Sequence, residues 1–138
     1  MTTFTPGKEP RLRGNLGAGA PRTVIIADDG KYTAEGTAEF GFVGRVHAIE
    51  AEINVITCDN SASLVFCVEA YNPGTGLWDT LANTGTVGTA VGCMLLVGPN
   101  VPQVADNSVA HVLRDRMRVH VKPADTKCIE YSIIVSAQ

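Results

Sequence analysis

Apolar and polar residues alternate along much of this chain, most regularly between residues 45 and 57. The residues on one side of this segment are apolar: Ile49, Ala51, Ile53 and Val55. Those on the other side are polar: Glu50, Glu52 and Asn54. A period of two places successive side chains on opposite faces of an extended chain. The segment is therefore predicted to be a half-buried β-strand with its polar face in solvent.

Similar patterns recur towards the C-terminus. In residues 63–71, the positions predicted to face inward are Leu64, Phe66, Val68 and Ala70. Residues 117–121 and 129–135 alternate on either side of a polar turn at 123–127, which predicts a hairpin that closes the domain. Residues 93–97 are apolar at every position, which predicts a strand covered on both faces.

Turn signals separate these segments and indicate the fold class. Asp-Gly at residues 29–30 and Asn-Pro-Gly-Thr-Gly at 72–76 are typical of tight connections between strands. A chain of 138 residues is long enough for one domain with a real core. We therefore predict an all-β protein in which residues 22–138 form an antiparallel β-sandwich, with jelly-roll and immunoglobulin-like topologies both open.

The first 21 residues differ from the rest in composition and charge. They are rich in Gly and Pro, and too poor in apolar residues to offset the entropy lost on ordering, so an extended N-terminal arm is predicted over residues 1–21. Residues 1–22 carry four basic residues and one acidic residue, a balance of +3. The remaining 7 basic and 13 acidic residues give −6. The chain thus has a basic arm and an acidic body. The acidic body is expected to bind nucleic acid poorly, because it repels phosphate.

Membrane and secretion signals are not apparent in the sequence. The N-terminus has neither a basic n-region nor an apolar h-region, and no window approaches the roughly 18 apolar residues of a membrane span. A soluble protein is expected.

No residue grouping indicates catalysis, a metal site or a cofactor. The four cysteines are widely spaced: Cys58, Cys67, Cys93 and Cys128. They are expected to be small buried hydrophobic residues with reduced thiols, although the sequence also allows one disulfide. The histidines are expected to be structural or exposed: His47, His111 and His120. No Ser or Cys stands in a nucleophile-elbow context, and Glu50 and Glu52 project from one strand face rather than across a cleft. The sequence therefore predicts a protein that is not an enzyme.

Two features suggest binding surfaces, and each has two interpretations. Tyr71 and Trp78 flank the 72–76 loop. Together with Asp79 they could bind a sugar by stacking, or they could contact a partner. Alternatively, Trp78 fills the core, as a tryptophan in a small sandwich more often does. Arg114, Arg116 and Arg118 have the spacing of one strand face. They are expected either to pair with acidic residues of the same domain, such as Glu130, or to meet an acidic surface of another subunit.

The order of these motifs resembles small β-sandwich virion proteins of tailed bacteriophages, which serve as capsid decoration (cement) proteins or as minor head and tail components. The segments that carry the resemblance are Asp29-Gly-Lys-Tyr-Thr-Ala-Glu-Gly-Thr-Ala-Glu-Phe40, Arg45-Val-His-Ala-Ile-Glu-Ala-Glu-Ile-Asn-Val55, Ser63-Leu-Val-Phe-Cys-Val-Glu-Ala70, Trp78-Asp-Thr-Leu81, Arg116-Met-Arg-Val-His-Val121 and Tyr131-Ser-Ile133.

The resemblance implies a structural protein that binds and stabilises the outside of a capsid. Its expected partner is the major capsid protein or another virion subunit. It is expected to form a homotrimer. It is expected to be assembled in the host cytoplasm and to lie on the exterior of the capsid. The residues expected to face the capsid are Lys8, Arg11, Arg13, Arg114, Arg116 and Arg118. A phage tail or head–tail connector component and a carbohydrate-binding β-sandwich are the alternatives. The protein is not expected to bind nucleic acid, a membrane or a cofactor.

Overall fold

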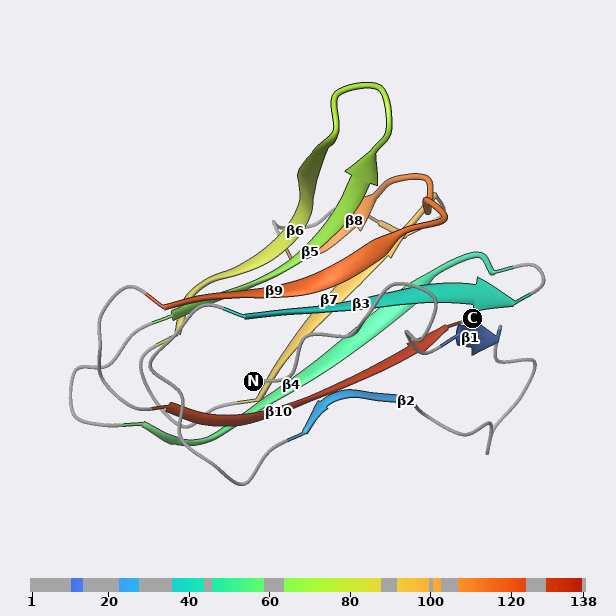
Figure 1. Cartoon of the computed structure of the whole chain (residues 1–138). Helices are drawn as coiled ribbons and strands as arrows, with labels where there is room; N and C mark the ends of the chain where they lie inside the picture. The colour runs from blue at the N-terminus through green and yellow to red at the C-terminus, as the bar shows by residue number, and fades with distance from the viewer. Residues whose placement is uncertain are drawn as a thin grey trace.

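The computed structural model describes residues 11–13, 23–27, 36–43, 46–58, 64–87, 92–99, 101–102, 107–123 and 129–137. These residues form ten strands and no helix. The strands make two five-stranded sheets that face each other as the layers of a sandwich (Figure 1). The predicted all-β sandwich is therefore confirmed.

The strands are named in chain order and fall into two sheets. The first sheet contains, in spatial order, β1 (Arg11–Arg13), β3 (Gly36–Val43), β9 (Met117–Pro123), β5 (Leu64–Asn72) and β6 (Leu77–Val87). The second sheet contains β2 (Thr23–Ala27), β10 (Ile129–Ala137), β4 (Ile49–Cys58), β7 (Gly92–Gly98) and β8 (Ser108–Ala110). Neighbouring strands are antiparallel except for the β1–β3 and β7–β8 pairs, which are parallel.

The strand pairing distinguishes between the two predicted topologies. β5 pairs with β6, β4 with β7, β3 with β9, and β2 with β10, so that each pair encloses the previous one along the chain. Successive pairs alternate between the two sheets. This nested, alternating arrangement is a jelly roll and not an immunoglobulin-like sandwich.

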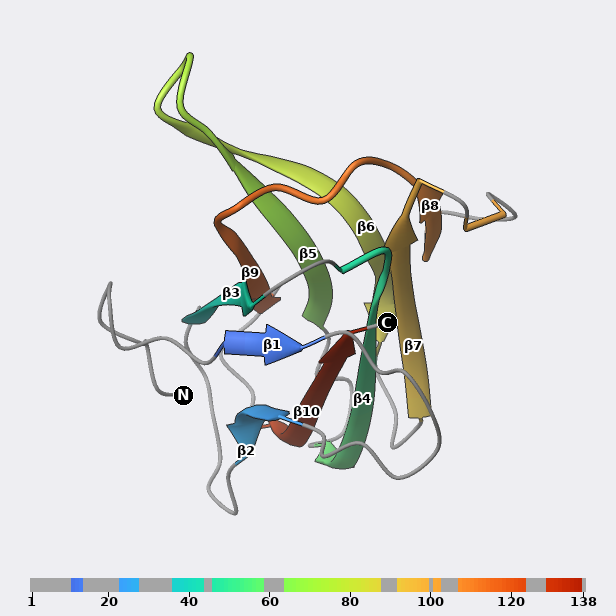
Figure 2. The same cartoon turned by 90° about the vertical axis from the view of Figure 1, so that its right-hand side faces the viewer.

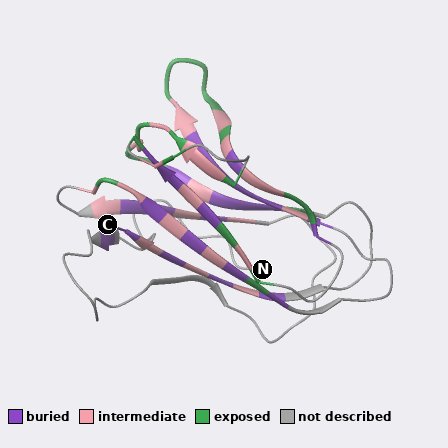
Figure 3. Ribbon diagram, turned by 180° about the vertical axis from the view of Figure 1, so that it is seen from behind, coloured by how far each residue is buried: buried purple, intermediate pink, exposed green. Residues whose placement is uncertain are grey.

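The core lies between the sheets and follows the period of two seen in the sequence. Buried and less buried residues alternate along several strands (Figure 3). The four inward positions predicted in residues 45–57 and the four in residues 63–71 are all buried. Phe66 on β5 and Tyr131 on β10 contact each other across the core edge to face, with ring centroids 5.2 Å apart.

One strand prediction is wrong. β7 was expected to be covered on both faces, but only one face is: Leu95 and Val97 are buried in the core and Cys93 packs against it, while Met94 on the other face is 42% exposed. The second sheet has no additional layer over its outer face in the described ranges, so the apolar outer positions of β7 stay partly in contact with solvent.

The predicted N-terminal arm contributes a strand to the domain. Arg11–Arg13 form β1, which pairs in parallel with Gly41–Val43 at the edge of the first sheet. Leu12 is 2% exposed and belongs to the core. This part of residues 1–21 therefore does not extend away from the body, and the rest of that segment lies outside the described residues.

The β5–β6 hairpin projects beyond the body of the sandwich (Figures 1 and 2). Its turn is held by Asn72, whose backbone oxygen accepts hydrogen bonds from Thr75 N (3.3 Å) and Gly76 N (2.8 Å). The Asn72 side-chain oxygen also accepts one from Gly74 N (2.9 Å). Gly76 has a φ of 72°, a conformation that favours glycine. The hairpin thus ends in a defined turn that presents its flanking side chains in fixed positions.

Candidate functional site

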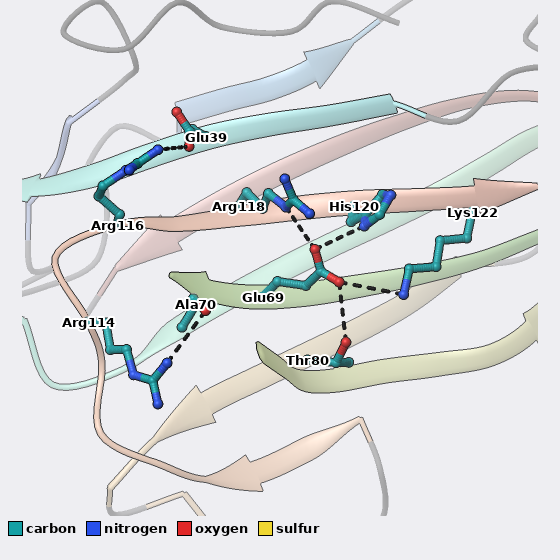
Figure 4. Close-up of polar contacts among 9 residues, drawn as sticks. All are labelled: Glu39, Glu69, Ala70, Thr80, Arg114, Arg116, Arg118, His120 and Lys122. Carbon is teal, nitrogen blue, oxygen red and sulfur yellow. Dashed lines mark hydrogen bonds and ion pairs between the residues drawn. The ribbon is translucent and has the colours of Figure 1, made fainter. Parts of the chain in front are cut away.

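A buried carboxylate lies on the outer face of the first sheet. Glu69 on β5 is only 3% exposed, although it points away from the core. Its oxygens are reached by four side chains (Figure 4): Arg118 Nε at 2.7 Å, His120 Nδ1 at 2.9 Å, Thr80 Oγ1 at 3.2 Å and Lys122 Nζ at 3.5 Å. We call these five residues the Glu69 cluster.

Strand register explains how these residues meet. β9 carries Arg118, His120 and Lys122 at a period of two, so all three project from its outer face. Glu69 lies opposite Arg118 on β9 and opposite Thr80 on β6. The carboxylate on β5 is thereby flanked on both sides by donors from the neighbouring strands, β9 and β6.

The donors outweigh the effect of burial on Glu69. Burial by itself raises the pKa of this carboxyl group. The hydrogen bond from Arg118, together with the charges of His120 and Arg118, lowers it further than burial raises it, so the pKa of Glu69 lies below its ordinary value. The anionic form is therefore the one that the folded protein stabilises.

We expect this cluster to make the protein sensitive to acid. Because the folded pKa of Glu69 is lower than the unfolded value of about 4.3, the stabilisation is complete above that value and is lost as the pH falls through the folded pKa. The free energy of unfolding, measured with denaturant from pH 7 down to pH 3, should fall in the acid range. The fall should be smaller in Glu69→Gln. An equal fall in the variant would show that other groups control the acid sensitivity.

A second group of residues adjoins the cluster at the base of the projecting hairpin. The guanidinium of Arg118 lies 4.2 Å from the centroid of the Trp78 ring, and that of Arg116 lies 4.4 Å from the Tyr71 ring and 5.3 Å from the Trp78 ring. The two aromatic rings contact each other with centroids 5.4 Å apart. Cation–π contacts of this kind fix planar groups against one another. We call these four residues the arginine–aromatic platform.

Two further ion pairs surround the platform. Arg116 Nη2 contacts Glu39 Oε1 on β3 at 2.7 Å, and Arg114 Nη1 contacts Asp79 Oδ2 on β6 at 2.7 Å. The hydrogen bond from Arg114 lowers the pKa of Asp79, with a smaller contribution from Asn72 Nδ2 at 3.3 Å, and both act against partial desolvation. Each arginine of the platform region is therefore already paired with a carboxylate of the same chain.

The structure brings together the three arginines predicted near the C-terminus, but not on one strand face. Only Arg118 lies within β9, because the strand begins at Met117, and Arg114 and Arg116 precede it. Their acidic partners belong to the same domain, as one of the two interpretations expected, and they are Glu39, Glu69 and Asp79. The side chain of Glu130 is outside the described part of the chain.

Other predicted residues are placed as follows. Lys8 lies outside the described residues, and for Arg11 and Arg13 only the backbone, in β1, is described. Trp78 does not fill the core, because it lies half-buried on the outer face of the first sheet beside Tyr71. Among the cysteines with described side chains, Cys67 and Cys93 are free thiols, and burial raises the pKa of both.

Sequence reasoning missed the Glu69 cluster. In the sequence, Glu69 occupies an outward position between the inward-facing Val68 and Ala70, and no role was predicted for it. His120 was expected to be structural or exposed, and it proves to be a buried partner of Glu69. The available signal was the period of two shared by Arg118, His120 and Lys122, but their relation to Glu69 depends on a register between strands that are about 50 residues apart in sequence.

Two kinds of feature are absent from the described ranges. No group of three or more His, Cys, Asp or Glu residues in the described part is placed to hold a metal ion. Likewise, no helix among the described residues is long and apolar enough to cross a membrane.

The protein is therefore a jelly-roll β-sandwich whose arginine–aromatic platform is paired with carboxylates of the same chain. No protein-family model matches the sequence, and neither does any curated protein. A solved structure described as "CBM4 structure and function" is similar, with a TM-score of 0.49 and 14% sequence identity over 85% of this chain and 78% of that chain.

Proposed function

We propose that this protein is a structural binding protein that attaches to another protein through the arginine–aromatic platform. The observation that carries the proposal is the combination of Tyr71, Trp78, Arg116 and Arg118 in one fixed arrangement at the base of a projecting hairpin. Tryptophan, tyrosine and arginine are the residues most enriched at the energetic centres of protein interfaces.

The internal ion pairs favour a protein partner. Side chains that are already held in place lose little conformational entropy when a partner covers them. Because Glu39 and Glu69 neutralise Arg116 and Arg118, docking would not bury an unpaired charge, which would otherwise be costly. The partner surface therefore need not be acidic, in contrast to one expectation from the sequence.

The more specific proposal is that the protein is a decoration protein on the outside of a tailed-phage capsid, with the major capsid protein as its partner. Its support is the resemblance of the strand and turn patterns to small phage virion proteins. A rigid sandwich with one prepared docking face suits such a role. A tail or head–tail connector component would use the same face on a different virion surface.

Binding to virion parts tests this proposal. Purified protein is mixed separately with undecorated heads and with tails of the phage that encodes the chain, and bound protein is measured by co-sedimentation. We expect binding to heads. Trp78→Ala should weaken it at least about 30-fold, the effect of losing an interface hot spot of about 2 kcal/mol. His47→Ala, at an exposed residue away from the platform, is the control and should bind as the wild type does.

The salt dependence gives a further readout of the same experiment. Since the platform charges are already paired, raising the salt from 50 to 500 mM should change the dissociation constant less than about tenfold. Binding to tails instead of heads would favour the connector or tail role. Binding to neither, or a gene outside any phage genome, would overturn the virion proposal.

Carbohydrate binding is the second candidate, and one observation favours it. A cavity of about 520 Å³ lies beside Tyr71, and Arg114 and Asp115 line it as polar groups. Against this candidate, guanidinium groups cover the rings of Tyr71 and Trp78 where a sugar would stack, and Asp79 is engaged by Arg114 and Asn72. Binding to a glycan array that is lost in Trp78→Ala would support this role over the first.

A further inference from the structure

The projecting hairpin and the connection from β8 to β9 form a hollow. This connection crosses from the second sheet to the first beside the hairpin (Figure 2). The hollow has a volume of about 520 Å³. Its apolar walls come from Tyr71 and Pro73 of the hairpin and from Leu113 of the connection. Pockets of this size hold small organic ligands, so the hollow has room for one long side chain of another molecule.

Direct contacts fix the two sides of the hollow relative to each other. The backbone of Tyr71 donates a hydrogen bond to the backbone oxygen of Arg116 over 2.9 Å, which ties the hairpin to the connection. From the connection, Arg114 Nη1 also reaches Asp79 Oδ2 on β6 at 2.7 Å. The hollow is therefore already formed, and a guest that fills it would have few further groups to order.

The rim of the hollow has one carboxylate in excess. Three charged residues line it, Arg114, Asp115 and Arg116. Both arginines are paired with acids of the same chain, Arg114 with Asp79 and Arg116 with Glu39. Asp115 is exposed, and its side chain forms no hydrogen bond or ion pair with any residue that the structure describes. The rim therefore carries the single negative charge of Asp115.

We propose that this hollow receives a lysine side chain of the partner protein, with the aliphatic stem on the apolar walls and the ammonium group at Asp115. Lysine side chains commonly bury their methylene groups on apolar atoms while the charged end stays in water. Apolar walls with one carboxylate at the rim suit both parts of such a side chain. An acidic guest would be repelled by Asp115, and a wholly apolar guest would gain nothing from it.

The hollow adjoins the platform, so that one partner can cover both. Tyr71 and Arg116 belong to the platform and also line the hollow. A partner that packs on Trp78 therefore brings its neighbouring side chains to the hollow. The lysine site names a residue type of the partner that the platform binds, and in this respect it rests on the proposed function.

Binding to undecorated phage heads tests the role of Asp115. Asp115→Asn should raise the dissociation constant about twofold to fivefold, the effect of losing one exposed ion pair. Asp115→Lys should raise it at least about tenfold, because two ammonium groups would then meet. The matched control is Asn54→Lys, which adds a positive charge at an exposed residue on the outer face of the second sheet. It should bind as the wild type does.

Small probes examine the hollow without the partner. The amides of Nα-acetyl-lysine and Nα-acetyl-norleucine share an aliphatic stem and differ in the ammonium group. Each is added to the isotope-labelled full chain, and the backbone amide signals of residues 113–116 are followed by NMR. The lysine probe should half-saturate these shifts at a concentration at least about twofold lower than the norleucine probe. This preference should disappear in Asp115→Asn.

The two experiments separate this inference from the proposed function. If Trp78→Ala weakens binding to heads but Asp115→Lys does not, the lysine site is wrong and the platform stands. If Trp78→Ala has no effect or heads are not bound, the proposed function fails, and the probes alone decide on the hollow. Equal affinity of the two probes, or a preference that persists in Asp115→Asn, would overturn the lysine site. Circular dichroism confirms that each variant is folded.

Discussion

Replacing Glu69 with Gln is expected to lower the free energy of unfolding by about 3 kcal/mol, because removing one partner of a buried ion pair leaves the other charges uncompensated. Arg118, His120 and Lys122 surround this carboxylate on one strand, and Glu69 is their shared acidic partner. In the variant, the basic side chains of β9 would surround a neutral amide instead of a carboxylate. Urea unfolding at pH 7 measures the difference.

Glu39→Gln is the matched control for this prediction. It makes the same chemical change on the outer face of the same sheet, and it removes the partner of one arginine, Arg116. The side chain of Glu39 is 13% exposed, but that of Arg116 is 48% exposed and can be solvated once its partner is lost, so the substitution should cost less than about 1 kcal/mol. Equal losses in the two variants would show that the more buried and more numerous partners of Glu69 do not make its ion pairs more important than that of Glu39.

The cluster connects the stability of the domain with its proposed binding face. Arg118 donates to Glu69 with Nε and places its guanidinium over Trp78. The carboxylate therefore fixes the arginine, and the arginine fixes the tryptophan. We infer that Glu69 acts on the platform as a positioning residue, so Glu69→Gln should also change the fluorescence of Trp78 in the folded protein, whereas Glu39→Gln should alter it less.

The sequence predicts those parts of the fold that depend on local alternation. In residues 49–55 and 64–70, the apolar positions at a period of two are buried because one face of each strand packs on the opposite sheet. The same rule fails in residues 93–97. There an uninterrupted apolar run suggested two covered faces, but Met94 lies on an outer face without a covering layer of described residues. Composition alone does not show how many layers a protein has.

The candidate site depends on contacts between strands that are distant in sequence. The alternation of Arg118 and His120 was visible, but Glu69 could be chosen as their partner only once β5 was known to lie between β9 and β6. Similarly, Trp78 would fill the core if β6 were shifted by one residue, since such a shift moves every side chain to the other face. Register, rather than residue type, therefore determines this site.

The N-terminal segment shows a third limit of sequence reasoning. Its many Gly and Pro residues predicted an arm, yet Arg11–Arg13 pair with β3 and Leu12 is buried in the core. Leu12→Ala is expected to lower the free energy of unfolding by about 2–3 kcal/mol, through lost apolar burial and the cavity left behind. Thermal and urea unfolding measure this change.

Leu77→Ala is the matched control, since it removes the same atoms from a side chain that is 66% exposed. It should cost less than about 0.5 kcal/mol at protein concentrations where the chain is monomeric. If Leu12→Ala were as mild as Leu77→Ala, β1 would contribute nothing to the domain, and the segment would be free to act as an arm. A large loss would instead mean that β1 is part of the folded domain, so truncations that test the arm should end before Arg11 and leave the domain intact.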